Sequence, residues 1–496
     1  MMNIDIKHPT KAYIDGATPD IIKSIRSQLT YINTSVSFQI KKHKENRWWK
    51  RSNIITWEEH LQVLTKQLKG CALHLENGKY WIRPGSISYL SETANIKNSI
   101  SYPNPKPIPW SSAPKFEPYP YQSKSVEELI SIKHGNISLP TGSGKSFALL
   151  MLARKMGLNA VIVTPSKSIF NELLSEFQKR LGKKYVGGYG DGKKDIKKKI
   201  TIAIGKSLTM LKPETEAYNF FRNKQMMMVD ESHTFAADQL EKVCHSVLED
   251  VPYRFFVSAT QTRNDGTEKK LQSIIGKTVL EMGLLEATEQ GYLCPLNFNI
   301  IEVISPSTVQ KRDPMECKRT HFLYNDNIAK MAARIANASW ESKQESTLIL
   351  VEELRQISML EKYLKIPYGY VHSADKKKSS EWDLEKVKLQ DEVDKFNNGE
   401  IKVLIGTRAI STGTNMYPTH NTINWVGGGS EILTKQGTMG RSTRKLEISD
   451  YAHLHKAKPF CRVYDFRVKG IPILEGQLQK RIKYYSESGG NIKFIQ

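Results

Sequence analysis

Short runs of apolar residues alternate with amphipathic stretches of helical period through most of the chain. Between residues 134 and 260 the apolar runs are GNISLP, NAVIVTP, ITIAIG, QMMMVDE and RFFVSAT, and between residues 346 and 466 they are STLILVE, YGYVHS, KVLIGT, TINWVG and CRVYDF. Runs that are apolar throughout, rather than at every second position, are typical of strands buried on both faces of a parallel sheet. The pattern therefore predicts two successive α/β domains.

The pattern differs at both ends of the chain and between the two series. Residues 1–100 mix alternating apolar stretches with helical ones and predict a small α+β unit, basic because 15 Lys and Arg face eight acids up to Lys97. Seven prolines between Pro103 and Pro120 favour an extended connection. Around residues 297–320 the sequence becomes polar and proline-containing. We expect a small basic N-terminal domain (1–100), a linker (101–118), two α/β domains (119–300 and 301–466) and a basic helical tail (467–496).

Charge adds a partner to this picture. The chain has 73 Lys and Arg against 51 Asp and Glu, a net charge of +22, and 39% hydrophobic residues, which indicate a folded protein. Such a surplus attracts polyanions, so nucleic acid is the first candidate, although basic proteins also use charge for solubility alone. No secretory or membrane-spanning segment is evident, and the five cysteines are too far apart for a zinc site. We expect a cytoplasmic protein, in the host cytoplasm if the chain is phage-encoded, with no membrane partner.

The segment from Leu139 to Ser146, LPTGSGKS, lies between an apolar run and an apolar helical stretch, as a P-loop does. Its glycines allow a tight backbone path that points N–H groups at phosphate oxygens, and the following helix start adds partial positive charge. The strict P-loop pattern has glycine where this chain has Leu139. We expect nucleotide contacts from Thr141, Gly142, Ser143, Gly144, Lys145 and Ser146, with Ser146 on Mg²⁺.

Two acids, Asp230 and Glu231, follow the apolar run MMMV, at the place where a carboxylate should come after a P-loop. We expect Asp230 to bind Mg²⁺ and Glu231 to orient the water that attacks the γ-phosphate. A lone Asp-Glu-Ser-His sequence is commonly an exposed turn, but its spacing from Lys145 favours the catalytic interpretation. ATP and Mg²⁺ are therefore the expected cofactors.

Further motifs occur in the order of the superfamily 2 helicases, and the chain resembles that family over about residues 119–466. Tyr121-Gln122 resembles the Q motif, VTPS at 163–166 motif Ia, SAT at 258–260 motif III, and GRSTR at 440–444 motif VI. Softer features, namely the basic N-terminal unit, the segment 284–295 and the strand ending at Asp465, are similar to phage branch-migration helicases of the UvsW type and to RecG-like proteins. The resemblance implies two tandem RecA-like motor domains.

The resemblance also implies roles for residues around the nucleotide. Tyr121 and Gln122 would bind adenine, and Gly413 would also bind the nucleotide. His233 would contact the γ-phosphate and couple the two domains. Ser258 and Thr260 would couple the acids to the second domain. Arg441 and Arg444 would complete the ATP site from the second domain, Arg444 as the arginine finger. We expect both to lie one helical turn apart, on one face of a helix that follows the loop TKQGTMG. Two departures stand out: Gly437 occupies the place of the family's motif VI glutamine, with Gln436 one residue upstream, and Asn415 replaces a frequent aspartate of motif V.

Nucleic-acid contacts are expected in each of the two α/β domains and in the N-terminal unit. The motor would hold one strand by its phosphates through Thr164, Ser166, Gly205 and Lys206 in the first domain and Ser373, Thr407, Arg408 and Thr412 in the second. Arg47, Trp48 and Trp49 interleave charge with aromatic rings, as duplex or fork binding requires, although one of the two Trp side chains is equally suited to a core. The lysine cluster 193–199 is more typical of a solvated loop than of a contact with the nucleic-acid strand.

We expect an ATP-dependent DNA helicase or translocase that unwinds or branch-migrates forked and four-way junctions in recombination, replication and repair. The expected partner is branched DNA, its single strand tracked by the motor and its duplex held by the N-terminal domain, and the protein is expected to be monomeric. An RNA helicase and an ATP-gated clamp without turnover are the alternatives. A restriction-type nuclease is disfavoured, because the Glu-x-Lys pairs Glu341/Lys343 and Glu400/Lys402 have no separate domain to hold metal-binding acids.

Overall fold

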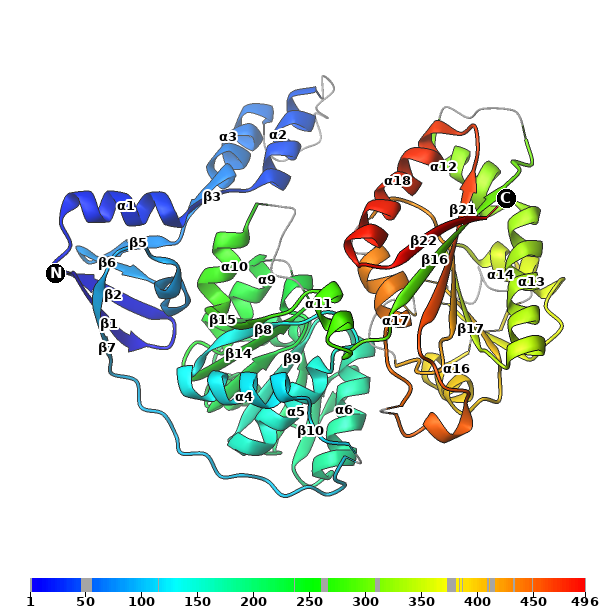
Figure 1. Cartoon of the computed structure of the whole chain (residues 1–496). Helices are drawn as coiled ribbons and strands as arrows, with labels where there is room; N and C mark the ends of the chain where they lie inside the picture. The colour runs from blue at the N-terminus through cyan, green and yellow to red at the C-terminus, as the bar shows by residue number, and fades with distance from the viewer. Residues whose placement is uncertain are drawn as a thin grey trace. The chain divides into compact units, whose positions relative to one another are not determined.

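The chain divides into two compact units in the computed structural model (Figure 1): Met1–Leu139 with Lys145–Glu281, and Pro140–Gly144 with Met282–Gln496. The structure describes residues 2–45, 56–114, 116–235, 237–259, 266–307, 313–372, 381–382, 384–385, 387–407, 410, 415–430, 433–447 and 449–495. Within these residues, no helix is long and apolar enough to cross a membrane.

The N-terminal part of the first unit is built on a five-stranded sheet. The strand order is β5-β6-β2-β1-β7, with β1 (Met2–His8), β2 (Lys11–Asp15), β5 (Leu73–Glu76), β6 (Lys79–Ile82) and β7 (Ala94–Asn98). The other elements are α1 (Pro19–Leu29), α2 (Thr34–Glu45), α3 (Trp57–Leu68), the 3₁₀ helix η1 (Pro84–Tyr89) and the strand pair β3 (Thr30–Ile32) and β4 (Lys69–Cys71). Thr18 caps α1, and Thr56 forms a capping box with Glu59 at the start of α3.

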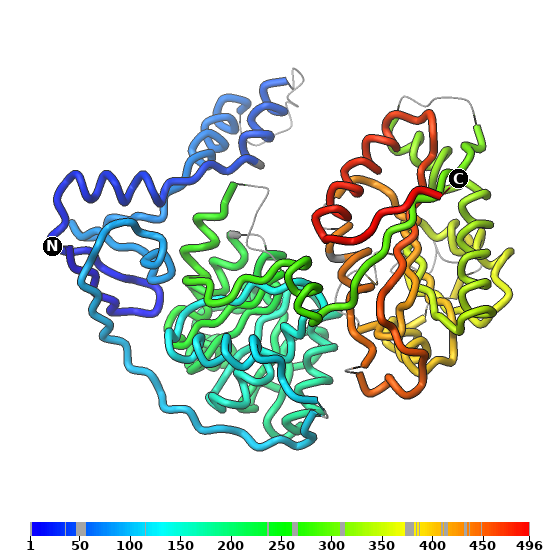
Figure 2. Tube along the Cα trace, in the orientation of Figure 1, coloured from blue at the N-terminus to red at the C-terminus, as the bar shows by residue number. Residues whose placement is uncertain are grey.

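The proline-rich segment after β7 is extended (Figure 2). Its backbone is hydrogen-bonded to the α/β domain that follows, the first of the two expected motor domains. The N–H groups of Lys106 and Ile108 donate to the carbonyls of Met156 and Arg154, and Ser111 donates to Arg180. Ile108 is buried, with 2% of its surface exposed. The linker therefore follows the first motor domain closely.

The first motor domain has an eight-stranded sheet in the order β11-β10-β12-β9-β13-β14-β8-β15. Its strands are β8 (His134–Ser138), β9 (Ala160–Thr164), β10 (Val186–Gly190), β11 (Lys193–Lys194), β12 (Ile200–Ile204), β13 (Met226–Val229), β14 (Tyr253–Ser258) and β15 (Lys277–Glu281), all parallel except β11. Its helices are α4 (Pro120–Ile132), α5 (Lys145–Met156), α6 (Lys167–Leu181), α7 (Gly205–Thr209), α8 (Glu216–Arg222), η2 (Ser232–Thr234), α9 (Ala237–Lys242), η3 (Val243–Val247) and α10 (Glu268–Ile275). All five strands expected here are confirmed.

The second unit holds a seven-stranded parallel sheet in the order β18-β19-β17-β20-β21-β16-β22. Its strands are β16 (Leu296–Val303), β17 (Thr347–Val351), β18 (Tyr368–Val371), β19 (Val403–Gly406), β20 (Asn421–Trp425), β21 (Cys461–Val468) and β22 (Asn491–Ile495). Its helices are α11 (Leu284–Glu289), α12 (Pro314–Lys318), η4 (Arg319–Leu323), α13 (Asp326–Lys343), α14 (Leu354–Glu361), α16 (Leu389–Asn397), η6 (Leu433–Met439), α17 (Gly440–Ser442), η7 (Ala452–Leu454) and α18 (Pro472–Glu487). The expected fold class, two tandem parallel-sheet α/β domains, is confirmed.

Two expected boundaries move. A boundary at residue 300 would cut β16, which pairs along its whole length with β21 and so belongs entirely to the second sheet. Residues 467–496 are also more than a helical tail, because β22 pairs with β16 and extends that sheet. The buried Arg481 of α18 donates to both carboxylate oxygens of Asp465 on β21, at 2.6 and 2.9 Å. The C-terminal segment is thus an integral layer of the second domain.

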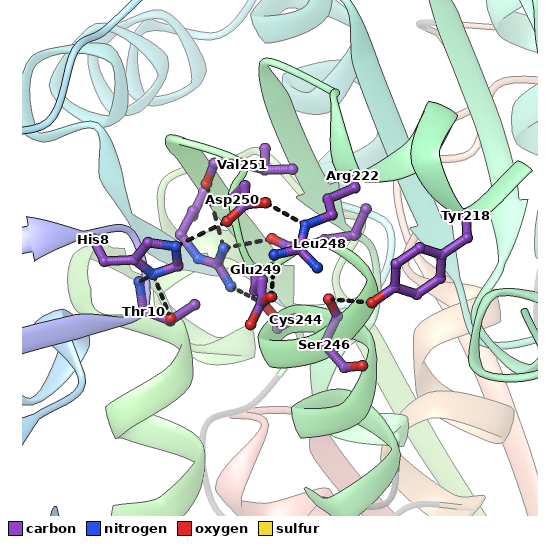
Figure 3. A network of polar contacts seen from close by, with 11 residues as sticks. His8, Thr10, Tyr218, Arg222, Cys244, Ser246, Leu248, Glu249, Asp250 and Val251 are labelled. Carbon is purple, nitrogen blue, oxygen red and sulfur yellow. Dashed lines mark hydrogen bonds and ion pairs between the residues drawn. The ribbon is translucent and has the colours of Figure 1, made fainter. Parts of the chain in front are cut away.

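Within the first unit, the N-terminal part is bound to the motor domain by polar contacts (Figure 3). His8 contacts Asp250 at 2.9 Å, and Asp250 in turn accepts from Arg222, which also pairs with Glu249. A second set of contacts is more buried. Arg83 pairs with Glu241 of α9 and donates to Ser273 Oγ of α10 at 3.2 Å.

Candidate active site

The sequence motifs of the first motor domain meet at one edge of its sheet. The strands β8, β14, β13 and β9 are neighbours in that order and run parallel, so their carboxyl ends lie side by side. The P-loop follows β8, SAT follows β14, the acids follow β13, and motif Ia follows β9. This edge is where ligands bind in open parallel α/β sheets.

The P-loop backbone requires its glycines. Gly142 and Gly144 have φ values of 93° and 80°, in the left-handed region that favours glycine. The buried Ser143 donates its hydroxyl to the carbonyl of Pro140 at 2.7 Å, which closes the turn before α5 begins at Lys145. The loop thus leads directly into a helix N-terminus, where backbone N–H groups are available to phosphate.

The departure at Leu139 has a structural role. Its N–H donates to the Ser258 carbonyl at 2.9 Å, which extends the pairing of β8 with β14 by one residue, and its side chain is fully buried. Its carbonyl accepts from Lys145 Nζ at 3.2 Å. A leucine fits here because the position belongs to the buried end of the sheet.

A continuous line of polar contacts joins three motifs. Lys145 Nζ lies 3.2 Å from Glu231 Oε1, Glu231 Oε2 lies 3.4 Å from His233 Nδ1, and the same nitrogen lies 2.8 Å from Ser258 Oγ. Lys145 is 7% exposed, so its charge is held in a poorly solvated place beside the carboxylate. The backbone of Glu231 has φ 48°, a left-handed conformation that is uncommon outside glycine and recurs at functional sites.

Asp230 is buried at the centre of this cluster. Burial raises the pKa of its carboxyl, the neighbouring Glu231 charge raises the pKa further, and the Lys145 ammonium lowers it. One carboxylate oxygen accepts the Glu231 N–H at 3.0 Å. Glu172 of α6, which the sequence did not single out, also raises the pKa, so the edge holds an excess of carboxylate that a cation would offset.

The donor set at this edge fits Mg²⁺. Ser146 and Asp230 offer a hydroxyl and a carboxylate oxygen, hard donors of the kind this ion takes, and Mg²⁺ obtains its remaining ligands from water and nucleotide phosphates. Among the described residues, no three His, Cys, Asp or Glu side chains form a metal cluster of their own. The expected ligands Ser146 and Asp230 therefore remain the candidates.

The Q-motif residues lie in the first turn of α4, the helix that precedes β8 in the chain. Gln122 is 3% exposed, and its amide oxygen accepts the Tyr119 N–H at 2.9 Å. Tyr121 is buried and stacks on Tyr119, with ring centroids 5.7 Å apart. The amide oxygen of Gln122 is thus already used to start the helix, which fixes the orientation of its side chain.

The expected strand contacts of the first domain differ in accessibility. Thr164 is completely buried, and its hydroxyl donates to the Ala203 carbonyl at 3.3 Å. Ser166 caps α6, Gly205 is buried where α7 begins, and Lys206 is exposed on α7. Ser166 and Lys206 are therefore the accessible pair of the four.

In the second unit, motif V and the segment leading to motif VI come together. Thr407, at the end of β19, lines a small hollow of about 30 Å³ with Thr434, Gly437 and Thr438. The segment TKQGTMG, expected as a loop, is helical: η6 begins at Leu433 and continues as α17 to Ser442. Two threonines and two glycines, residues of low helix propensity, obscure the helical period of this segment, and η6 has the wide turns of a π-helix.

The two motif VI arginines therefore differ in setting. Arg441 lies on α17 and is 3% exposed, whereas Arg444 is half-buried and lies beyond the helix end, not on the same helical face as expected. Ser442 anchors α17 to the sheet through the Thr422 hydroxyl at 2.6 Å. The expected site residues Thr260, Ser373, Arg408, Thr412, Gly413, Arg47, Trp48 and Trp49, and the side chain of Gln436, lie outside the described residues.

Two family models match the chain, and together they span more than half of it. One, described as "Type III restriction enzyme, res subunit", matches residues 115–263, and the other, "Helicase conserved C-terminal domain", matches residues 328–444. The first match contains the P-loop and the Asp230–His233 segment, and the second ends at Arg444.

Curated proteins similar to the chain include helicases. "Putative helicase 22" of a Sulfolobus islandicus filamentous virus is 24% identical over 421 residues, covering 78% of this chain and 70% of that protein. "DNA 3'-5' translocase XPB2" of Sulfurisphaera tokodaii is 22% identical over 384 residues, covering 71% and 82%.

Among solved structures, Saccharomyces cerevisiae Dbp5 bound to RNA and ADP BeF3 has a TM-score of 0.52 and 12% identity, covering 76% of this chain and 90% of that one. This likeness concerns the fold alone. The crystal structure of T4 UvsW is matched over 99% of this chain and 98% of that one at 14% identity, with a TM-score of 0.42.

Proposed function

The chain belongs to superfamily 2 of the helicases, and we propose that it is an ATP-dependent DNA helicase or translocase. Its proposed substrates are forked and four-way DNA junctions, which it unwinds or branch-migrates in recombination, replication and repair. The single strand would be tracked by the motor and the duplex held by the N-terminal domain. We place the protein as a monomer in the cytoplasm, the host's if the chain is viral like its similar putative helicase.

The observation that carries this proposal is the polar line from Lys145 through Glu231 and His233 to Ser258. A lysine at a helix N-terminus neutralises phosphate charge, and a carboxylate fixed beside it can orient a water molecule. His233 Nδ1 lies against both the Glu231 carboxylate and the Ser258 hydroxyl, so a change at the phosphate would be passed to the end of β14. The arrangement suits hydrolysis that is coupled to movement.

The proposed chemistry is mainly positioning and charge stabilisation. Loop N–H groups and Lys145 would hold the β- and γ-phosphates, and Glu231 would orient the attacking water. Mg²⁺ held by Ser146 and Asp230 would neutralise the charge that develops on the phosphate oxygens. Arg441 and Arg444 would add cations from the second domain when the domains close, so hydrolysis would depend on closure.

Movement along DNA would follow from the same closure. Ser166 and Lys206 would hold phosphates in the first domain and Thr407, Arg408 and Thr412 in the second. Phosphate contacts hold the backbone of any sequence, as a translocase requires. Each ATP cycle would change the spacing between the two sets of contacts, so one set would advance along the strand.

DNA is favoured over RNA by two observations. The similar XPB2 protein is named a DNA translocase, and the N-terminal unit has a surplus of Lys and Arg that suits contact with a duplex arm. The decisive experiment is steady-state ATP hydrolysis with single-stranded, duplex, forked and four-way DNA and with matching RNA. We expect the largest stimulation with branched DNA; larger stimulation by structured RNA would assign the protein to the RNA helicases instead.

A further inference from the structure

The helix that follows motif Ia presents one polar face. Along α6, Lys167, Asn171, Ser175 and Lys179 recur at every fourth residue, Lys183 continues the spacing just past the helix end, and all five are exposed. The opposite face is buried and holds apolar side chains such as Phe170, Leu173 and Phe177. A spacing of four keeps neighbouring side chains on one side of a helix, so these residues form a stripe.

An open hollow lies along the second half of this stripe. It has a volume of about 440 Å³ and is lined by Asn171, Leu174, Ser175, Gln178, Lys179, Lys183 and Lys193. Three of these side chains are cationic and three are neutral hydrogen-bonding groups; among the described residues lining it, none is acidic and none is aromatic. Lys193 comes from β11, so the hollow is bounded by the edge of the sheet as well as by α6.

Two carboxylates beside the hollow are engaged by neighbouring side chains, and neither of them lines it. Asp191 pairs with Lys167 at 2.9 Å and accepts from Asn171 at 3.1 Å, at the motif Ia end of the stripe. Glu176 pairs with Arg180 at 2.8 Å. Residues 179–199 nonetheless contain nine Lys and Arg against two Asp, so the far end of the stripe carries a strong positive charge.

We propose that this α6 hollow, with Lys179, Lys183 and Lys193, binds the phosphate backbone of a double-stranded arm of the nucleic-acid substrate. The inference rests on the proposed function and adds a duplex contact on the motor domain itself. Binding of unpaired bases calls for aromatic stacking platforms, which the lining does not offer, whereas a helical backbone needs only cations and hydrogen-bond donors. Charge complementarity therefore favours a duplex.

The expected contacts with the single strand, which we call the track, lead into the stripe and support a duplex arm as its occupant. Ser166, one of these contacts, caps the N-terminus of α6, so the stripe begins where the track reaches this helix. A helix of 15 residues is about 22 Å long, which corresponds to the rise of roughly six base pairs of B-DNA. The stripe is long enough to follow a duplex arm that leaves the track.

The test is a charge reversal with a matched control. Lys179→Glu/Lys183→Glu alters the hollow, and Lys124→Glu/Lys277→Glu makes the same change in charge on α4 and on β15, the opposite edge strand of the sheet. All four lysines are exposed, so both variants should fold, which circular dichroism checks. Affinity is measured for a short single strand and for the same strand joined to a duplex arm, at several salt concentrations.

We expect the hollow variant to bind the tailed duplex roughly tenfold more weakly than the control variant. The slope of log affinity against log salt concentration should also be smaller in magnitude by about two, because two phosphate contacts are lost. Its affinity for the single strand should equal that of the control. Equal affinity of both variants for the tailed duplex would overturn the inference and leave the site to a different polyanion, such as an acidic protein surface. Equal weakening for single strand and tailed duplex would also overturn it. If wild-type ATP hydrolysis shows no response to any nucleic acid, the proposed function itself fails, and that result is distinct from both.

Discussion

Lys145 contacts two oxygen groups within its own domain, the Leu139 carbonyl and the Glu231 carboxylate. Nucleotide phosphate would compete for the same ammonium group. Lys145 thereby holds the loop and the acid in register, and its charge offsets the carboxylates that raise the pKa of Asp230. The residue serves the geometry of the site as well as the binding of phosphate.

Replacing this side chain should separate hydrolysis from DNA binding. We predict that Lys145→Ala lowers ATP turnover by at least about a hundredfold, because the phosphate loses its cation. DNA affinity should stay close to that of the wild type. Lys155→Ala, on the same helix but in an exposed pair with Glu127, is the control and should retain turnover. Wild-type hydrolysis by Lys145→Ala would remove the P-loop from the catalytic site.

A second lysine offers a test of stability that is independent of ATP. Burial lowers the pKa of Lys224 from 10.5 to about 7, and its ammonium contacts Thr201 Oγ1 at 3.1 Å. Between these two pH values the unfolded chain binds a proton that the folded chain does not, so this group makes the protein more stable as pH rises through that range.

We predict that Lys224→Met weakens this rise in the free energy of unfolding. The free energy of unfolding of the variant should exceed that of the wild type most near pH 7 and least near pH 10, as measured by urea unfolding at both values. Lys212→Met, at an exposed lysine, should show no such trend. A Lys224→Met effect that is the same at both pH values would mean that the buried amine does not titrate in this range.

At the scale of elements, the N-terminal part contacts the helices that follow the two motor motifs. α9 comes after the Asp230–His233 segment, and α10 comes after the SAT motif. Arg83 pairs with Glu241 on α9 and donates to Ser273 on α10, while Lys270 of α10 also pairs with Glu241 at 2.7 Å. Gly85 lies so close to the Ser273 backbone that no side chain would fit. A shift of the N-terminal part would therefore be felt at both helices.

We predict that Arg83→Met leaves basal ATP turnover unchanged but reduces the preference for forked over single-stranded DNA by roughly fivefold or more, the size of a typical coupling between sites. The measurement is ATP hydrolysis titrated with each DNA. Lys11→Met is the matched control, because Lys11 pairs with Glu76 inside the N-terminal part. An unchanged fork preference in Arg83→Met would exclude coupling through these helices.

The sequence predicted the strands that are apolar throughout, because two buried faces leave no polar positions. It did not predict β16 (Leu296–Val303), whose apolar run is interrupted by Asn297, Asn299 and Glu302, or β22, a mostly exposed edge strand. In the site, the spacing of Lys145 and Asp230 predicted the motifs, but the contact between His233 and Ser258 depends on the pairing of β13 with β14. Arg83 carries no local signal, since its partners lie more than 150 residues away.

At the scale of the whole molecule, the proposed function makes ATP hydrolysis depend on closure of the two motor domains, which brings Arg444 to the nucleotide. Arg444→Lys should keep ATP and DNA binding but lower DNA-stimulated hydrolysis about a hundredfold, because a lysine cannot reproduce the planar, forked contact of a guanidinium with phosphate. Lys445→Arg, at the next residue, is the control. If Arg444→Lys retained full stimulation, the arginine-finger assignment would be withdrawn.

The proposed function requires that ATP hydrolysis drives movement on branched DNA. Its most direct test is strand separation of a forked duplex by the wild-type protein, followed with ATP and with a non-hydrolysable analogue. We predict separated strands with ATP only, and none for Lys145→Ala. Equal strand separation with the analogue, or none with ATP despite tight fork binding, would contradict it and indicate a clamp gated by nucleotide binding.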